Sequence, residues 1–189
     1  DEPVDLDGKI NAVVTVTDGD GDVATDSVAI GAMIEFEDDG PTASIAAVAE
    51  AIASVDETDD ADNLADPFGI GVPLGVDTET LITTTGSDAG EDEEGADTSV
   101  TLEIVAADSG LSTTDGTGIM LYDNSGVVEG RVGGENGAVA FAVSIDDDGL
   151  VTVAQYLSLE HPDSPDNYDE PVDLDGKINR SEERRVGKE

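Results

Sequence analysis

Apolar and polar residues alternate along most of this chain, in short runs separated by Gly, Asp or Asn. The runs NAVVTVTD at 11–18 and AVAFAVSI at 138–145 show the pattern most clearly. Alternation is typical of strands, because successive side chains point to opposite faces of a sheet. We therefore predict nine strands, at 11–18, 26–37, 42–49, 80–85, 98–107, 118–123, 126–132, 138–145 and 150–157.

Turn residues link the predicted strands, and helix signals are nearly absent. Two hairpin turns are almost explicit, YDNSGVV around 123–126 and SIDDDGLV around 146–149, because Asp, Asn and Gly tolerate the left-handed backbone of tight turns. Longer loops are expected at 56–75 and 86–97. Many short strands at this spacing predict an all-β fold, an antiparallel β-sandwich.

An internal repeat sets the domain organisation. Residues 1–11 and 169–179 share the sequence DEPVDLDGKIN letter for letter, which gives a period of 168 residues (169 minus 1). A period of this length corresponds to a whole domain rather than to a solenoid repeat. We therefore expect a fragment of a tandem array. Residues 1–40 would be the C-terminal part of one repeat unit, and residues 41–179 the following unit without its last strands, with a loosely attached hairpin at 11–37. The alternative is that residues 1–40 complete the sandwich of residues 41–179 as a circular permutant.

The last ten residues break the repeat. After Asn179 the chain reads RSEERRVGKE, where the first copy continues AVVTVTDGDGD, and four of the seven basic residues lie in this tail. The tail resembles the translation of a sequencing adapter, and a natural basic tail is the alternative. We interpret residues 180–189 as a non-native tail and expect them to contribute nothing to the fold.

The charge of the chain restricts its partners. With 46 acidic and seven basic residues, the formal net charge is −39, which repels nucleic acid and anionic membrane surfaces and attracts cations. An apolar fraction of 38%, arranged in alternation, favours a folded chain over an acidic disordered one. The chain has no Cys and 3% aromatic residues, so each core must be small and aliphatic. No apolar run approaches the roughly 20 residues of a membrane-spanning helix, so we expect no direct membrane insertion.

The most distinctive acidic cluster is TDGDGDVATD, in which Asp18, Asp20 and Asp22 alternate with glycine and Asp26 follows. Carboxylates at alternate positions of a tight turn can converge on one point, which suits the six to eight oxygen ligands of Ca²⁺. The spacing excludes an EF-hand, because the sixth position from Asp18 is Val23 rather than Gly. We predict a calcium site here, and a solvated acidic turn is the alternative.

A second acidic cluster, FEDDGP at 36–41, lies at the expected junction of two repeat units. Asp38 and Asp39 supply oxygens there, and Pro41 stiffens the chain. Calcium bound between neighbouring sandwiches would make such a junction rigid. The same residues also make an ordinary turn, so both interpretations stay open.

Nothing in the sequence indicates an enzyme. The chain has no Cys nucleophile, no G-x-S-x-G motif, no phosphate-binding glycine loop and a single histidine, His161, which cannot form a zinc pair. Acidic residues occur throughout, so they do not single out a pair of catalytic carboxylates. We expect a non-enzymatic protein.

Several motifs together resemble one family. The segments VTVAQYLSLEHPD, DEPVDLDGKIN, VTVTDGDGDVATDSVAIG and FEDDGPTASI, circularly shifted over residues 1–179, are similar to the repeat domain of giant RTX-type adhesins exported by bacterial type I secretion. The most specific parts are TDGDGD at 17–22, EDDGP at 37–41 and the stretch with Gln155, Tyr156 and His161. The glycine-rich nonapeptide repeats of such proteins are absent from this sequence.

The resemblance implies an immunoglobulin-like extender module in a secreted or surface-anchored protein of a Gram-negative bacterium, assembled into a calcium-dependent stalk. It implies neighbouring repeat domains of the same chain as partners, and a host or surface ligand bound through other domains. The expected metal ligands are Asp18, Asp20, Asp22, Asp26, Asp38 and Asp39, with Ca²⁺ as the cofactor. The alternative is a carbohydrate- or protein-binding sandwich module, although aromatic residues for a stacking platform are few.

Overall fold

The computed structural model describes residues 4–57, 64–91, 94–161 and 172–185. The chain divides into two compact units. The N-terminal unit comprises residues 1–42 and 89–93, and the sandwich unit comprises residues 43–88 and 94–189. The assignment of residues 1–40 and 41–179 to successive repeats of a parent protein stays a prediction.

The N-terminal unit is a hairpin with a short connecting sheet. Strands β2 (Asn11–Thr17) and β3 (Val23–Ala29) pair antiparallel over their whole length, and all of their residues are exposed. Strand β1 (Val4–Asp5) pairs with β4 (Glu35–Phe36), and a 3-10 turn, η1 (Gly31–Met33), precedes β4. The second strand was expected at 26–37. It begins earlier and ends at Ala29 because it pairs residue for residue with β2 before the chain turns at Gly31.

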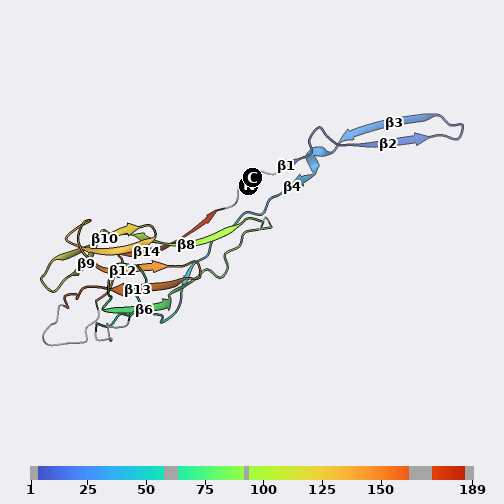
Figure 1. Ribbon diagram of the computed structural model, residues 1–189. Coiled ribbons are helices and arrows are strands. Elements are labelled where there is room, and N and C mark those ends of the chain that lie inside the picture. Colours follow the sequence, from blue (N-terminus) through green and yellow to red (C-terminus); the bar gives the residue numbers. More distant parts are fainter. Residues whose placement is uncertain (1–3, 58–63, 92–93, 162–171, 186–189) are drawn as a thin grey trace. The chain divides into compact units, whose positions relative to one another are not determined.

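A six-stranded antiparallel sheet forms the larger layer of the sandwich unit (Figure 1). Four hairpin connections link its last five strands into a meander, and β6 pairs with β13 at the far edge. In spatial order the strands are β6 (Gly75–Thr80), β13 (Leu150–Gln155), β12 (Val139–Ile145), β11 (Val127–Val132), β10 (Gly118–Asn124) and β9 (Asp108–Ser112).

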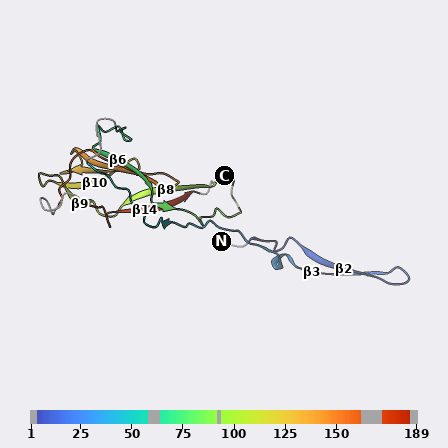
Figure 2. The ribbon, with the colours of Figure 1, turned by 90° about the horizontal axis from the view of Figure 1, so that it is seen from below.

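The second layer consists of two short sheets. Strand β8 (Asp97–Ile104) pairs with β14 (Ile178–Arg185), as Figure 2 shows, and β5 (Ala46–Ala47) pairs with β7 (Ile82–Thr83). Strand β8 lies against β10, β11 and β12. The described residues contain no α-helix, so the prediction of an all-β antiparallel sandwich is confirmed.

The core lies between the two layers. Leu102 and Ile104 of β8 and Ile178 of β14 pack against buried residues of the large sheet. The buried set is Ile119, Leu121, Val128, Ala140, Phe141, Val143 and Val151. It contains one aromatic ring, as the composition led us to expect. The close fit is visible at Gly130, where a Cβ atom would overlap the Phe141 ring.

Both predicted hairpin turns are present. Between β10 and β11 the two loop residues, Ser125 and Gly126, have φ values of 57° and 88°, and Gly126 N donates to Asp123 Oδ1 at 2.9 Å. Positive φ at both loop residues matches the twist of the flanking strands. Between β12 and β13, Leu150 N donates to Asp146 Oδ1 at 2.9 Å. In each turn, the aspartate from which the turn was predicted accepts a stabilising backbone hydrogen bond.

Two strands of the large sheet were not predicted where they lie. Strand β6 begins at the last residue of the expected loop at 56–75 and ends where the expected strand at 80–85 begins. It was missed because its sequence GVDTET carries polar residues and alternates weakly. Strand β9, DSGLS, contains Gly110 at a φ of 77° and was also missed. Both are edge strands of the sheet, where one side needs no apolar pattern.

The tail departs from expectation. Residues 180–185 were expected to add nothing to the fold, but they form most of β14 and pair with β8 from Arg180↔Leu102 to Arg185↔Asp97. A strand ladder is built from backbone groups, so it depends little on the side chains of residues 180–185 once its register is set. Here the preceding residues set the register, since Val105 N donates to Lys177 O at 2.9 Å.

Candidate metal site

The turn between β2 and β3 folds through local hydrogen bonds. Asp18 N donates to Asp22 O at 2.9 Å, and Gly21 N donates to Asp18 O at 3.3 Å. Gly21 has a φ of 98°, a conformation that L side chains rarely adopt. The glycines of TDGDGD therefore make the turn tight enough to bring its three aspartates together.

The backbone of the turn stabilises the charged form of Asp18. Its Oδ1 accepts hydrogen bonds from Asp20 N at 3.3 Å, Gly21 N at 3.1 Å and Asp22 N at 2.9 Å. The pKa of Asp18 is lowered, first by a hydrogen bond with the Asp20 side chain and then by the Asp22 N–H. The carboxylate is thus held in the ionised form that a cation would require.

Asp18, Asp20 and Asp22 are close enough to bind one metal ion. One carboxylate oxygen of each lies within 4.8 Å of the others, and all three side chains are exposed. Oxygens bound to one Ca²⁺ at about 2.3–2.6 Å are separated by up to about 5 Å, so the cluster fits the ion's first shell. Three carboxylates supply only part of the six to eight oxygens, and backbone carbonyls or water would complete the shell.

The other three predicted ligands do not join this cluster in the described part of the chain. Asp26 lies within β3 opposite Val14, and its Oδ1 accepts a hydrogen bond from Ser27 N at 2.8 Å. Asp38 and Asp39 follow β4 and are exposed, and the backbone of Gly90 approaches Asp39. Metal binding by these three residues stays a prediction.

Sequence reasoning missed a buried charged pair in the sandwich unit. Glu129 of β11 is 4% exposed. It forms an ion pair with Arg131, whose Nε donates to Glu129 Oε2 at 2.7 Å, and Asn124 Nδ2 donates to Glu129 Oε1 at 2.8 Å. The signal was available, because Arg131 is the only arginine before residue 180 and alternates with Glu129 in one strand. All of these partners are structural, so the pair forms no open site.

A second set of polar contacts joins Glu57 and Asp66 to the end of strand β13 and the residue after it. Tyr156 OH donates to Asp66 Oδ1 at 2.7 Å, and Gln155 Nε2 donates to Glu57 Oε1 at 2.5 Å. The Tyr156 hydroxyl, as the largest cause, and the N–H groups of Phe68 and Gly71 lower the pKa of Asp66 to about 2. Burial and the Asp66 carboxylate raise the pKa of Tyr156. Two residues of the motif that carried the family resemblance thus have structural roles.

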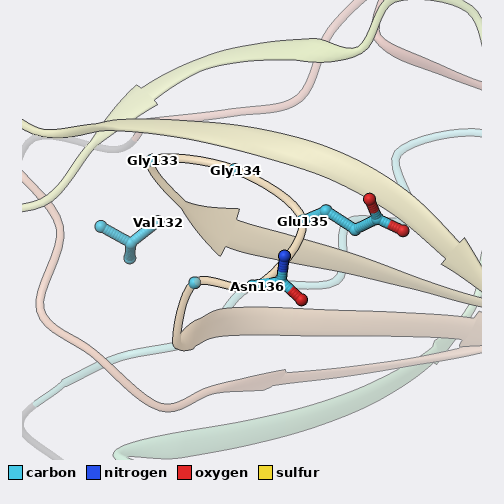
Figure 3. Close-up of a pocket in the computed structure, with 6 residues that line it drawn as sticks. Val132, Gly133, Gly134, Glu135 and Asn136 are labelled. Carbon is cyan, nitrogen blue, oxygen red and sulfur yellow. The ribbon is translucent and has the colours of Figure 1, made fainter.

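The loop after β11 surrounds a shallow hollow of about 330 Å³ (Figure 3). Its lining is Val132, Gly133, Gly134, Glu135, Asn136 and Gly137. In Figure 3 the side chains of Val132, Glu135 and Asn136 point in different directions. A binding site needs convergent polar groups, so this hollow is a weak candidate for ligand binding.

Fold and site together define an all-β sandwich domain preceded by a hairpin with a metal-competent acidic turn. The family model described as "Domain of unknown function (DUF5801)" matches residues 52–182, more than half of the chain, and the chain belongs to this family. The matched region begins before β6 and ends inside β14. No curated protein and no solved structure matches the chain. No helix in the described residues is long and apolar enough to cross a membrane.

Proposed function

We propose that this chain is a non-enzymatic structural module, a stalk or extender segment of a secreted or surface-anchored bacterial adhesin, which calcium stabilises and makes rigid. The observation that carries the calcium part is the convergence of Asp18, Asp20 and Asp22 on one point. The 168-residue repeat and the resemblance to RTX-type adhesin repeats support the stalk part. The all-β sandwich is compatible with both parts.

The site has the properties of a weak calcium site. Its carboxylates are exposed, so water screens their mutual repulsion and also competes for the ion. Affinities of about 10⁻⁴ to 10⁻³ M are typical of extracellular calcium modules. A chain with a net charge of −39 repels itself in the compact state, and bound dications reduce this repulsion.

A calcium titration followed by NMR tests the site. We expect the amide signals of residues 18–22 to shift with Ca²⁺ and to respond far less to matched Mg²⁺ or NaCl, because a flexible oxygen cage favours the larger ion. Replacing Asp18, Asp20 and Asp22 together by Asn keeps the side-chain size and removes three charges. This triple variant should lose the calcium-specific shifts and keep any response to NaCl.

A matched variant controls for net charge. Glu35→Gln, Glu37→Gln and Glu79→Gln remove three charges from exposed residues outside the turn. This variant should keep the calcium response. If the Asn triple variant responds to calcium like the native chain, the turn is not an ion site.

The stalk role is tested separately on a chain of three successive periods, built from residues 12–179. Calcium should lengthen and stiffen this array, which small-angle scattering would report as a larger radius of gyration at constant mass. An array whose dimensions do not change with calcium would contradict the rigid stalk even if the aspartate turn binds the ion.

A further inference from the structure

The two copies of DLDGKI, at 5–10 and 173–178, fold into the same turn. Lys9 N donates to Leu6 O at 2.9 Å, and Lys177 N donates to Leu174 O at 3.1 Å. Asp7 N donates to Asp5 Oδ1 at 2.9 Å, and the second copy repeats this contact at 3.0 Å. The glycines at positions 8 and 176 have φ values of 68° and 67°. The two turns therefore have the same local conformation, and a strand follows each of them.

The strands that follow these turns have different neighbours. After the second turn, β14 pairs with β8, and Ile178 packs on the core of the sandwich. After the first turn, β2 pairs with β3. Within the described residues β8 has no partner besides β14, and β2 has none besides β3. One long edge of β2 therefore stays available for pairing.

The hairpin has an apolar face that nothing in the described structure covers. Residues that lie opposite each other in a ladder share a face, so the register groups Ala12, Val14, Val16, Ala24 and Val28. These five residues are here called the apolar face of the hairpin, and Asp26 is the acidic residue on it. Val14, Val16 and Val28 are 57%, 60% and 60% exposed. The opposite face carries Val13, Val23 and Ala29, but its other five residues are Asn, Thr and Ser, so it is the more polar of the two faces.

The repeat offset defines how this hairpin would fit β8. Adding 168 places Ile10 at the position of Ile178, which pairs with Ile104. In the same register Ala12 would pair with Leu102, and Val14 with Val100. Val100 is 4% exposed, and Leu102 and Ile104 pack on the core. The register thus selects the same face of β2 that the hairpin's own pattern makes apolar.

In the chain as it stands, β14 brings charged residues into this ladder. The register pairs Arg180 with Leu102 and Glu182 with Val100, where β2 would offer Ala and Val. Cross-strand pairs of apolar residues stabilise a sheet. The segment at 180–185 is therefore a poor occupant of the edge, although its attachment to the same chain gives it a high effective concentration.

We propose that the β8 edge of the sandwich unit is a docking site for the β2–β3 hairpin of a second copy of this chain. Strand β2 of one copy takes the place of residues 180–185 of the other, and the apolar face of the hairpin covers the core beside β8. The partner's β3 then becomes the new edge strand, where Asp26 would discourage further pairing. The contact needs no metal ion, so it stands or falls independently of the calcium site.

The proposed contact is head to tail, because the donor hairpin and the acceptor edge are different surfaces of the chain. Each copy carries one of each, so association continues into open chains rather than closing into a symmetric dimer. In a tandem array the same contact would link successive units.

The test uses two full-length variants. The acceptor can offer only its β8 edge, and the donor can offer only its β2–β3 hairpin. The acceptor carries Glu182→Pro and Glu183→Pro, because one of two adjacent strand residues directs its N–H to β8, and proline removes it. It also carries Val14→Asp and Val16→Asp, which disable its own hairpin. The donor carries AVVTVT at 180–185, which locks its own edge. A control acceptor with Ser at 182 and 183 keeps both N–H groups.

Sedimentation of the mixture gives the result. Donor and acceptor alone should be monomers of about 19 kDa, and the mixture should form a complex of twice the chain mass that does not grow further. The Ser control should bind the donor at least tenfold more weakly. A mixture that stays monomeric at about 100 µM, with a folded acceptor, would overturn the proposal.

Disulfide trapping gives a second measurement that does not depend on folding of the proline variant. The chain has no cysteine, so Thr15→Cys in one copy and Ser99→Cys in another report the proposed register directly, because Thr15 would take the place of Glu183 and lie opposite Ser99. Thr15→Cys with Glu103→Cys is the mismatched control. Both pairs are oxidised in a glutathione buffer with the native tail and with the open edge. If the matched pair forms more disulfide-linked dimer than the mismatched pair in either background, the result supports the proposal. If the matched pair forms no more dimer than the mismatched pair in both backgrounds, the result overturns it.

Discussion

The chain contains the sequence DLDGKI in two different surroundings, and the isoleucine at its end is exposed in one copy and packed on the core in the other. The turns at 5–10 and 173–178 share two hydrogen bonds, and their glycines have nearly the same φ. However, Ile10 is 38% exposed beside the hairpin, whereas Ile178 packs on the core cluster of the sandwich. The turn is therefore encoded locally, and the burial of the strand that follows depends on whether a complementary edge is present.

The two units differ in the same way as the two turns. The sandwich unit has a continuous aliphatic core between two layers. In the hairpin of the N-terminal unit, both strands are exposed along their whole length. A two-stranded hairpin alone is at best marginally stable in water. Both units thus contain paired strands, and only the sandwich unit gains the stabilisation of an apolar core.

Identical substitutions at the two isoleucines give the sharpest test of this comparison. Ile178→Ala removes side-chain contacts with the core and should lower the free energy of unfolding of the sandwich by about 2 kcal/mol. Ile10→Ala at the equivalent position should change it by less than about 0.5 kcal/mol. Urea denaturation followed by circular dichroism measures both values. Equal effects would mean that Ile10 also packs in a core.

Alanine at either turn glycine should have the same local conformational cost, but only the substitution at Gly176 should lower the stability of the sandwich. A Cβ on Gly8 or Gly176 meets no atom within 4 Å, so an alanine there faces only the unfavourable positive φ. That conformation costs about 1 kcal/mol for alanine. Gly176→Ala should lower the stability of the sandwich by this amount, because the turn sets the register of β14. Gly8→Ala should leave sandwich unfolding unchanged, and hydrogen exchange should show faster opening of β2.

These contrasts also explain what the sequence could predict. Alternation and Asp-, Asn- and Gly-rich turns are local signals, so most strands and both hairpin turns were predicted. The aspartates at 18, 20 and 22 were found in the same way, since the turn that gathers them is local. The pairing of β8 with β14 was not predicted, because it depends on a register between residues far apart in the sequence.

The polar contacts of the sandwich unit were missed for the same reason. Glu129 and Asp66 are two carboxylates among 46 acidic residues, and only the fold shows that Glu129 is buried and that Asp66 accepts a hydrogen bond from Tyr156. A solitary arginine inside a strand was a usable signal for Glu129. Nothing in the sequence distinguished Asp66 from the acidic residues around it, because its partner Tyr156 is 90 residues away.

The smallest predicted effect concerns two aspartates whose pKa values are lowered, one by neighbours in the sequence and the other by a residue far away in the sequence. The pKa values of both Asp18 and Asp66 are lowered, the first by groups of its own turn and the second mainly by the Tyr156 hydroxyl. Tyr156→Phe should therefore raise the pKa of Asp66 from about 2 toward the ordinary 3.8 and leave that of Asp18 unchanged. NMR titration of the side-chain carboxyl signals measures both values.

The same variant should alter acid stability in a defined direction. Because the folded-state pKa of Asp66 is depressed, its ionised form stabilises the fold above pH 3.8, and this contribution is lost as the pH falls toward 2. In Tyr156→Phe the folded and unfolded pKa values approach each other, so the pH dependence of unfolding between these limits should become shallower. The Asp18→Asn variant serves as the comparison, since its turn lies outside the sandwich unit. If Tyr156→Phe leaves the slope unchanged while Asp18→Asn flattens it for the sandwich, the assignment of local and distant causes is wrong.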